Sequence, residues 1–250
     1  MKSIKILKSF TTQDELNSEI WDYADSTNDR EPEMYPEVRD KLLEAADNFI
    51  KFIGVDLDIE DITMTGSLSN YNWSEFSDVD LHLLVDMDNL ENKELYKELF
   101  AAKQSLWNSL HDVSVKGFEV EVYIQSASEP HYSSGVYSVM NDQWLVSPNK
   151  VEFDLDDKKI LDKTRGWMEI IDGLQRKSYL LPPEETLDIL EKVKDKLKKF
   201  RGAGLKSGGE YSYENLTFKF LRRNGYLRKL SELKRELVDD TLSLEEQKIF

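Results

Sequence analysis

Two short segments in which an apolar residue recurs at every second position constrain the fold of this chain most. Residues 78–85 place valine and leucine at their odd positions, and residues 118–125 place phenylalanine, valine and isoleucine at their even positions. A period of two is typical of a β-strand with one buried face. The polar positions of these two predicted strands hold four acids, namely Asp78, Asp80, Glu119 and Glu121. Each pair is therefore expected to project from one side of its strand.

Helical periodicity surrounds the alternating segments. Apolar residues recur at three- and four-residue steps in residues 36–53, with Pro36 at the start and Gly54 just past the end, which predicts an amphipathic helix. A second helix is expected at residues 92–110, and a short strand at residues 61–65. The order helix, strand, strand, helix, strand favours an α+β core.

The chain after residue 150 is expected to be largely helical. Residues 157–175 and 183–200 are amphipathic, the glycine-rich run at 201–210 predicts a loop, and a last helical region follows over 216–233. This organisation predicts three parts: an N-terminal arm at 1–35 of unclear role, a core at 36–150 and a C-terminal helical domain at 151–250.

Composition excludes several kinds of chemistry. The chain has no cysteine, so disulfides, thiolate zinc sites and cysteine nucleophiles are excluded, and its three histidines are scattered. No apolar run approaches the roughly 18 residues that a membrane span needs, and the N-terminus lacks the apolar region of a signal peptide. A soluble cytoplasmic protein without a membrane partner is expected.

The formal net charge of -16 is unevenly distributed. Residues 1–150 carry 12 Lys and Arg against 29 Asp and Glu, whereas residues 192–235 carry 14 basic residues against 4 acidic ones. Such a basic segment can supply phosphate contacts, or it can simply be a solvated helix face.

The segment 65–82 holds the most informative motif. Gly66 and Ser67 are followed by ten residues and then by Asp78 and Asp80. Two carboxylates at i and i+2 on a strand repel each other unless cations lie between them. Two Mg²⁺ ions about 3.5–4 Å apart can use such a pair to activate a hydroxyl and to neutralise a leaving pyrophosphate. The Gly-Ser turn offers backbone N–H groups and a hydroxyl to an anion.

A hydrophobic strand that ends in Gly-Ser, followed about ten residues later by Asp-x-Asp between hydrophobic residues, resembles the signature of DNA polymerase β-like nucleotidyltransferases. The resemblance covers roughly residues 61–125 and implies a small mixed sheet with flanking helices, here followed by an α-helical module. It implies that Gly66 and Ser67 hold nucleotide phosphates and that Asp78 and Asp80 bind Mg²⁺ or Mn²⁺.

The same family uses a third acid on a later strand, and this chain offers two candidates. Glu121 is preferred because it lies in the middle of its strand, and Glu119 is the alternative. The family often has aspartate at this position, so a glutamate departs from the pattern and would move the metal by about one C–C bond. The sequence of residues 66–86 and 129–139 looks closest to that of uncharacterised predicted nucleotidyltransferases of tailed bacteriophages, which implies the host cytoplasm.

Further nucleotide contacts are expected in the loop before Asp78 and in the C-terminal part, because a helical domain often closes the nucleotide cleft in this family. The candidates are Ser77, Lys206, Ser207, Tyr211, Lys219, Arg222 and Arg223. The last three share one helical face at i, i+3 and i+4. The polar loop 129–138 is either a base or ribose contact or an ordinary connector.

The activity implied is transfer of a nucleoside monophosphate from an NTP to a hydroxyl acceptor, with release of pyrophosphate. The acceptor stays open among an RNA 3′ end, a protein hydroxyl, a small molecule and a second nucleotide. Two alternatives also stay open: a non-catalytic nucleotide-binding or antitoxin-like module, and an acidic protein whose C-terminal helices dock a partner. Other Asp-x-Asp pairs, such as Asp56 with Asp58, lack a Gly-Ser at the right distance.

Overall fold

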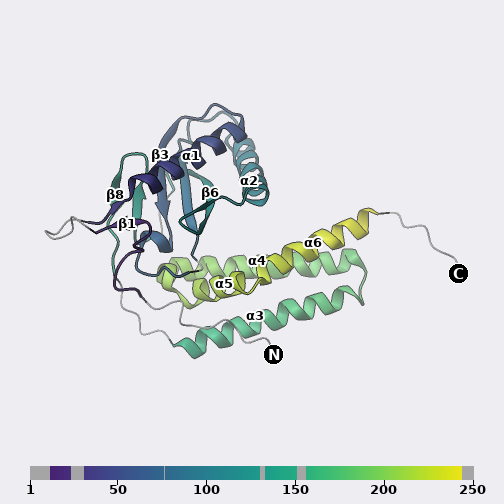
Figure 1. The fold of residues 1–250 in the computed structure, drawn as a ribbon. Helices are drawn as coiled ribbons and strands as arrows, with labels where there is room; N and C mark the ends of the chain where they lie inside the picture. The colour runs from purple at the N-terminus through teal and green to yellow at the C-terminus, as the bar shows by residue number, and fades with distance from the viewer. Residues whose placement is uncertain (1–11, 24–30, 76, 130–132, 151–155, 244–250) are drawn as a thin grey trace. The chain divides into compact units, whose positions relative to one another are not determined.

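A computed structural model describes residues 12–23, 31–75, 77–129, 133–150 and 156–243 (Figure 1). The described residues fall into two compact units, one within Leu7–Phe153 and one within Asp154–Phe250. Each unit has a hydrophobic core of its own. Within the described ranges, no helix is long and apolar enough to cross a membrane.

The first unit is built on a mixed six-stranded sheet of order β5-β6-β4-β3-β7-β8. The strands are β3 (Ile59–Thr65), β4 (Val79–Val85), β5 (Ser114–Val115), β6 (Phe118–Ser126), β7 (Val136–Ser138) and β8 (Gln143–Val146). β4 and β6 are parallel, and the other neighbouring strands are antiparallel. Parallel neighbours require a crossover connection, which here contains helix α2 (Lys93–Leu110).

Helices α1 (Pro36–Ile53) and α2 share one hydrophobic core with a single face of the sheet. The side chains of Val79, Leu81 and Leu83 are fully buried on that face. α1 begins at Pro36 and is followed by Gly54, whose φ of 72° is the left-handed conformation that favours glycine just past a helix end. The alternation and helical periodicity of the sequence therefore predicted the central elements of this unit.

The N-terminal part of the chain belongs to this core. Strands β1 (Trp21–Asp22) and β2 (Glu33–Met34) form a small antiparallel sheet. Leu16, Ile20 and Trp21 are buried in the same hydrophobic cluster as the main sheet. The sequence had left the role of this arm open.

The strands β7 and β8, on one side of the sheet, were not predicted. They have three and four residues, which is too short for a period of two to be distinguished from chance. Their structure depends on pairing with β3 and with each other, a contact between residues about 75 positions apart in the case of Thr63 and Ser138.

The second unit is helical. Its helices are α3 (Asp157–Ser178), α4 (Pro183–Gly208), α5 (Tyr213–Arg223) and α6 (Tyr226–Leu242). The apolar faces of these helices meet in a cluster that includes Trp167, Ile171, Leu190, Leu221 and Leu233. The described residues thus form a mixed α+β protein with six α-helices and a six-stranded sheet.

The prediction of a loop at 201–210 was wrong, because α4 continues to Gly208. Gly204 lies against the start of α5, where a Cβ atom would be 2.5 Å from Glu214 Cβ and 2.6 Å from Ser212 Oγ. The helix therefore continues although each glycine costs about 1 kcal/mol in helix propensity, and at Gly204 the absence of a side chain lets α5 approach closely. The last predicted helical region also divides into two helices at Gly225, whose φ is 75°.

The packing at Gly204 can be tested with two alanine substitutions in α4. Gly204→Ala should lower the free energy of unfolding by about 1–3 kcal/mol, because its methyl group overlaps α5. Gly202→Ala is the matched control, since a Cβ there meets nothing within 4 Å. It should raise the free energy of unfolding by about 0.5–1 kcal/mol through helix propensity. Urea unfolding followed by circular dichroism measures both, and equal effects would contradict this account.

Candidate functional site

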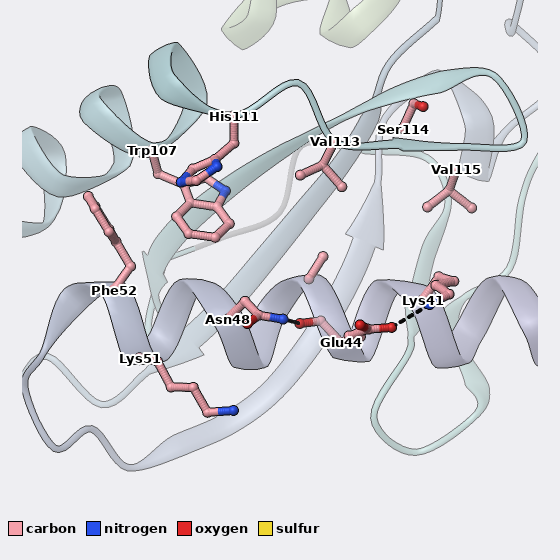
Figure 2. A pocket seen from close by; sticks show the side chains of 11 residues that line it. Lys41, Glu44, Asn48, Lys51, Phe52, Trp107, His111, Val113, Ser114 and Val115 are labelled. Atoms are coloured by element: carbon pink, nitrogen blue, oxygen red, sulfur yellow. Dashed lines mark hydrogen bonds and ion pairs between the residues drawn. The ribbon is translucent and has the colours of Figure 1, made fainter.

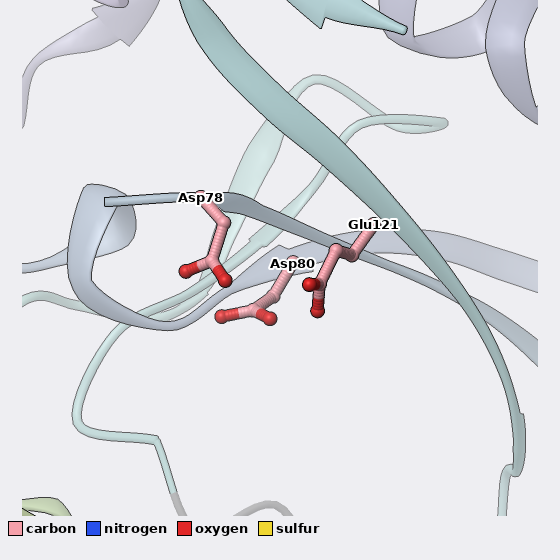
Figure 3. A group of neighbouring side chains, drawn as sticks. All are labelled: Asp78, Asp80 and Glu121. Carbon is pink, nitrogen blue, oxygen red and sulfur yellow. The ribbon is translucent and has the colours of Figure 1, made fainter. Parts of the chain in front are cut away.

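Three carboxylates converge at one end of the central strands. The parallel register of β4 and β6 places Asp80 opposite Glu121, and Asp78 immediately precedes β4. One carboxylate oxygen of each residue lies within 4.8 Å of those of the other two. Figure 3 shows the three side chains pointing toward one another. The structure thus brings together the two aspartates and the preferred third acid of the sequence analysis.

The alternative third acid, Glu119, lies further toward the start of β6. It pairs with Ser114 of β5 and its side chain is exposed. Glu121 is half-buried and belongs to the acidic group. Alternation along β6 places both glutamates on the same face of the sheet. The register between β4 and β6 decides which of them lies beside the aspartates, and that residue is Glu121.

The three acids project from the sheet face opposite α1 and α2. Between Asp78 and Asp80 on the chain, Val79 has no exposed surface and packs into the core of the first unit. The same holds for Leu81 on the other side of Asp80. Burial of these neighbours fixes the orientation of β4. Because successive side chains on a strand point to opposite faces, the carboxylates must then point away from the core.

Tyr123 supports Glu121 on the same face of β6. Its hydroxyl donates a hydrogen bond to Glu121 Oε2. Its ring stacks on that of His82, the residue opposite it on β4, with ring centroids 5.0 Å apart and an interplanar angle of 22°. Tyr123 was not predicted as part of the site, although its position two residues after Glu121 on a strand was the available signal. His82 is thereby held in a stacking contact beside the acids.

The Gly-Ser turn lies directly against Asp80. β3 ends at Thr65, which pairs with Asp80, and Gly66 follows with φ 80° and ψ -159°. A Cβ atom at Gly66 would lie 2.0 Å from Asp80 Oδ2. Both the backbone conformation and the available space therefore require glycine here.

Serine hydroxyls close the loop between the turn and the aspartates. Ser67 Oγ and Ser77 Oγ form a buried hydrogen bond of 2.8 Å. Ser77 Oγ also accepts from the backbone N–H of Ser74 at 3.0 Å. Ser77, predicted as a nucleotide contact, thus joins the two ends of the loop just before Asp78.

The chain after β6 packs against the same turn. The backbone N–H of Gly66 donates to Ser133 Oγ at 3.3 Å, and the side-chain amide of Asn70 donates to Ser134 Oγ. A Cβ atom at Gly135 would lie 1.9 Å from Ser69 O, so the two backbones are in close contact. His131 and Tyr132 of the predicted base- or ribose-binding loop lie outside the described residues.

The acidic group fits a hard divalent cation. All three candidate ligands are carboxylates, and carboxylate oxygens suit Mg²⁺ and Mn²⁺. Three carboxylates this close repel one another in the absence of positive charge. The glycine at position 66 also leaves the Asp80 carboxylate room that any larger residue would fill.

The predicted contacts of the C-terminal part all lie in the second unit. Lys206 and Ser207 are exposed in the last turn of α4, and Tyr211 lies in the short 3₁₀ turn Gly209–Tyr211. Lys219, Arg222 and Arg223 are half-buried on α5. Their spacing in the helix places them on one face of α5.

A separate pocket of about 670 Å³ opens beside α1, the end of α2 and β5 (Figure 2). Its lining includes Phe52 and Trp107, with charged residues such as Glu44 and Lys51. Trp107 belongs to the core between the helices and the sheet, whereas the acidic side chains project from the other face. The pocket is therefore not part of the acidic site, and no sequence pattern predicted it.

Comparisons with known proteins do not assign this chain to a family. No protein-family model matches the chain, and no curated protein matches it in sequence. A solved structure, the STING-associated CdnE c-di-GMP synthase from Capnocytophaga granulosa, is 14% identical and covers 83% of this chain and 84% of that chain, with a TM-score of 0.24. A TM-score of 0.24 does not establish a shared fold, so the site is interpreted from its own geometry.

The contact between Gly66 and Asp80 predicts a specific effect on cation binding. Gly66→Ala should weaken Mn²⁺ binding by about 10- to 100-fold, the usual effect of displacing the support of a metal ligand. Titration of free Mn²⁺ by electron paramagnetic resonance measures the affinity. Gly54→Ala is the control for introducing a side chain at a positive φ, because φ is 72° at Gly54 and a Cβ there meets nothing within 4 Å. Mn²⁺ binding that is equally strong in both variants would rule out this role of Gly66.

Proposed function

We propose that this protein is a metal-dependent nucleotidyltransferase that moves a nucleoside monophosphate from an NTP to a hydroxyl acceptor and releases pyrophosphate. The observation that carries the proposal is the convergence of Asp78, Asp80 and Glu121 beside a glycine turn that contacts Asp80. It is supported by the spacing of Gly66-Ser67 and Asp-x-Asp, which resembles the polymerase β-like signature.

In this proposal the three acids have two roles, metal binding and proton transfer. Asp78 and Asp80 hold a pair of Mg²⁺ or Mn²⁺ ions, and such a pair lowers the pKa of an attacking hydroxyl and neutralises the leaving pyrophosphate. Glu121 completes the site and accepts the proton of the acceptor hydroxyl. The hydrogen bond from Tyr123 orients the Glu121 carboxylate for that task.

Gly66 and Ser67 are proposed to bind the β- and γ-phosphates. The hydrogen bond from Gly66 N–H to Ser133 Oγ is 3.3 Å long, slightly longer than the usual N–H···O distance, and is therefore weak. A phosphate oxygen is charged and forms a stronger bond with the same donor. The nucleotide can therefore displace Ser133 from Gly66 at small cost.

The basic residues of the second unit are proposed as phosphate contacts. Lys219, Arg222 and Arg223 present three cations on one face of α5, in a segment whose net charge is opposite to that of the first 150 residues.

The identity of the hydroxyl acceptor is left open. The acidic character of the first 150 residues does not favour a long polynucleotide, since its phosphates normally follow a positive track.

The activity itself is tested by incubating the protein with each NTP and Mg²⁺ or Mn²⁺. Pyrophosphate release is measured, and mass spectrometry identifies the products, including any modified form of the protein. Asp78→Asn and Asp80→Asn should each reduce turnover by about 100-fold or more, because several kcal/mol of charge stabilisation is lost.

Asp58→Asn is the matched control for these variants. Asp58 is an exposed member of another Asp-x-Asp pair in the same unit, and its substitution should leave turnover unchanged. The proposal is wrong if the two site variants and the wild type behave identically across a full panel of acceptors.

A second pair of variants tests the choice of the third acid. Glu121→Gln should reduce turnover by about 100-fold, whereas Glu119→Gln should change it less than about threefold, since Glu121 alone of the two belongs to the acidic group. Steady-state kinetics with saturating Mg²⁺ distinguishes them. A larger loss of turnover in Glu119→Gln than in Glu121→Gln would identify Glu119 as the third acid.

A further inference from the structure

The N-terminal segment, residues 12–23, is bonded to the loop that carries the Gly-Ser turn. We call residues 66–77 the site loop. The indole N–H of Trp21 donates to the backbone carbonyl of Leu68 at 2.7 Å, and this bond is buried. The two residues are 47 positions apart in sequence, and Leu68 lies two residues after Gly66.

Three more hydrogen bonds join the same segments. The backbone N–H of Gln13 donates to Tyr71 O at 2.7 Å, and its side-chain amide donates to Trp73 O at 3.3 Å. In the opposite direction, the indole N–H of Trp73 donates to Glu15 O at 2.9 Å. Four bonds therefore connect one short segment with the middle of the site loop.

Trp21 is a rigid anchor for this connection. Its side chain has no exposed surface. It stacks on Trp144 with ring centroids 4.5 Å apart and meets Tyr137 edge to face at 4.9 Å. Tyr137 belongs to β7 and Trp144 to β8, so the position of the indole N–H is fixed by the sheet.

The site loop lacks this kind of support from its own backbone. Apart from the short 3₁₀ turn Ser67–Ser69, its described residues are in no helix or strand. Yet one end of the loop holds Gly66 against Asp80, and its other end leads directly into Asp78. A shift of the loop would therefore move both the phosphate-binding turn and one of the acids.

We infer that the N-terminal segment sets the geometry of the catalytic centre, with Trp21 as a positioning residue that acts through Leu68 O. This inference rests on the proposed function for its effect on turnover. The contact itself is a property of the fold and can be tested without any activity.

The experiment compares Trp21→Phe with Trp144→Phe in the full-length protein. Both changes remove an indole N–H from the same aromatic cluster and keep an aromatic ring. Trp144 is the matched control, because its N–H donates to Pro32 O at 2.8 Å and not to the site loop. Both variants are expected to lower the melting temperature by a similar amount.

Three measurements distinguish the variants well below their melting temperatures. Trp21→Phe should reduce kcat by about 10- to 100-fold, since misplacement of reacting groups by about 1 Å can cost that much. It should also accelerate amide hydrogen exchange in peptides covering 66–77, and raise the Mn²⁺ concentration needed for half-saturation. Trp144→Phe should change kcat less than about threefold and leave exchange in 66–77 at the wild-type rate.

The outcomes separate this inference from the proposed function. If both variants lose the same activity, or if exchange in 66–77 is unchanged in Trp21→Phe, Trp21 does not position the loop. If the wild type transfers no nucleotide with any acceptor, the proposed function fails, and hydrogen exchange still decides whether Trp21 holds the loop. Should Trp21→Phe fail to fold, Trp73→Phe removes the bond to Glu15 O from the loop side and should increase exchange in 66–77.

Discussion

The parallel pairing of β4 with β6 is the constraint on which the site depends. It sets Asp80 opposite Glu121 and so places like charges side by side, an arrangement that is unfavourable on its own. The pairing is stabilised from the other face, where Val79, Leu81 and Val122 are buried in the core beneath α1 and α2. Burial of apolar area thus holds the acids together, and a bound cation would relieve their repulsion.

The Gly-Ser turn and its loop add a second layer of constraint. Gly66 is required by a positive φ and by the 2.0 Å that would separate a Cβ from Asp80 Oδ2. The loop beyond it is held by hydrogen bonds from two distant parts of the chain, the N-terminal segment and the segment after β6, and by the hydrogen bond between Ser67 and Ser77 within the loop. The loop is therefore positioned by long-range contacts, and its geometry depends on the complete first unit.

The central fold could be predicted because it follows from local patterns. Alternation gave β4 and β6, helical periodicity with Pro36 and Gly54 gave α1, and the order of elements gave the α+β class. Residues 201–208 were predicted as a loop but belong to α4. Glycine lowers helix propensity, and the close approach of α5 to Gly204 leaves no signal in the local sequence. The strand β7, with β8 beside it, and the N-terminal segment were not predicted for the same reason: both depend on partners far away in sequence.

The sequence by itself determined which residues have the chemistry for the site: an Asp-x-Asp pair on a strand, a Gly-Ser ten residues before it, and two glutamates on a second alternating strand. Residue type and periodicity are local properties, so they can be read without a fold. Only the tertiary structure decided that Glu121 rather than Glu119 meets the aspartates, because that choice depends on the register between β4 and β6. It likewise decided the roles of Tyr123 and Trp21, whose partners are fixed by packing and not by sequence distance.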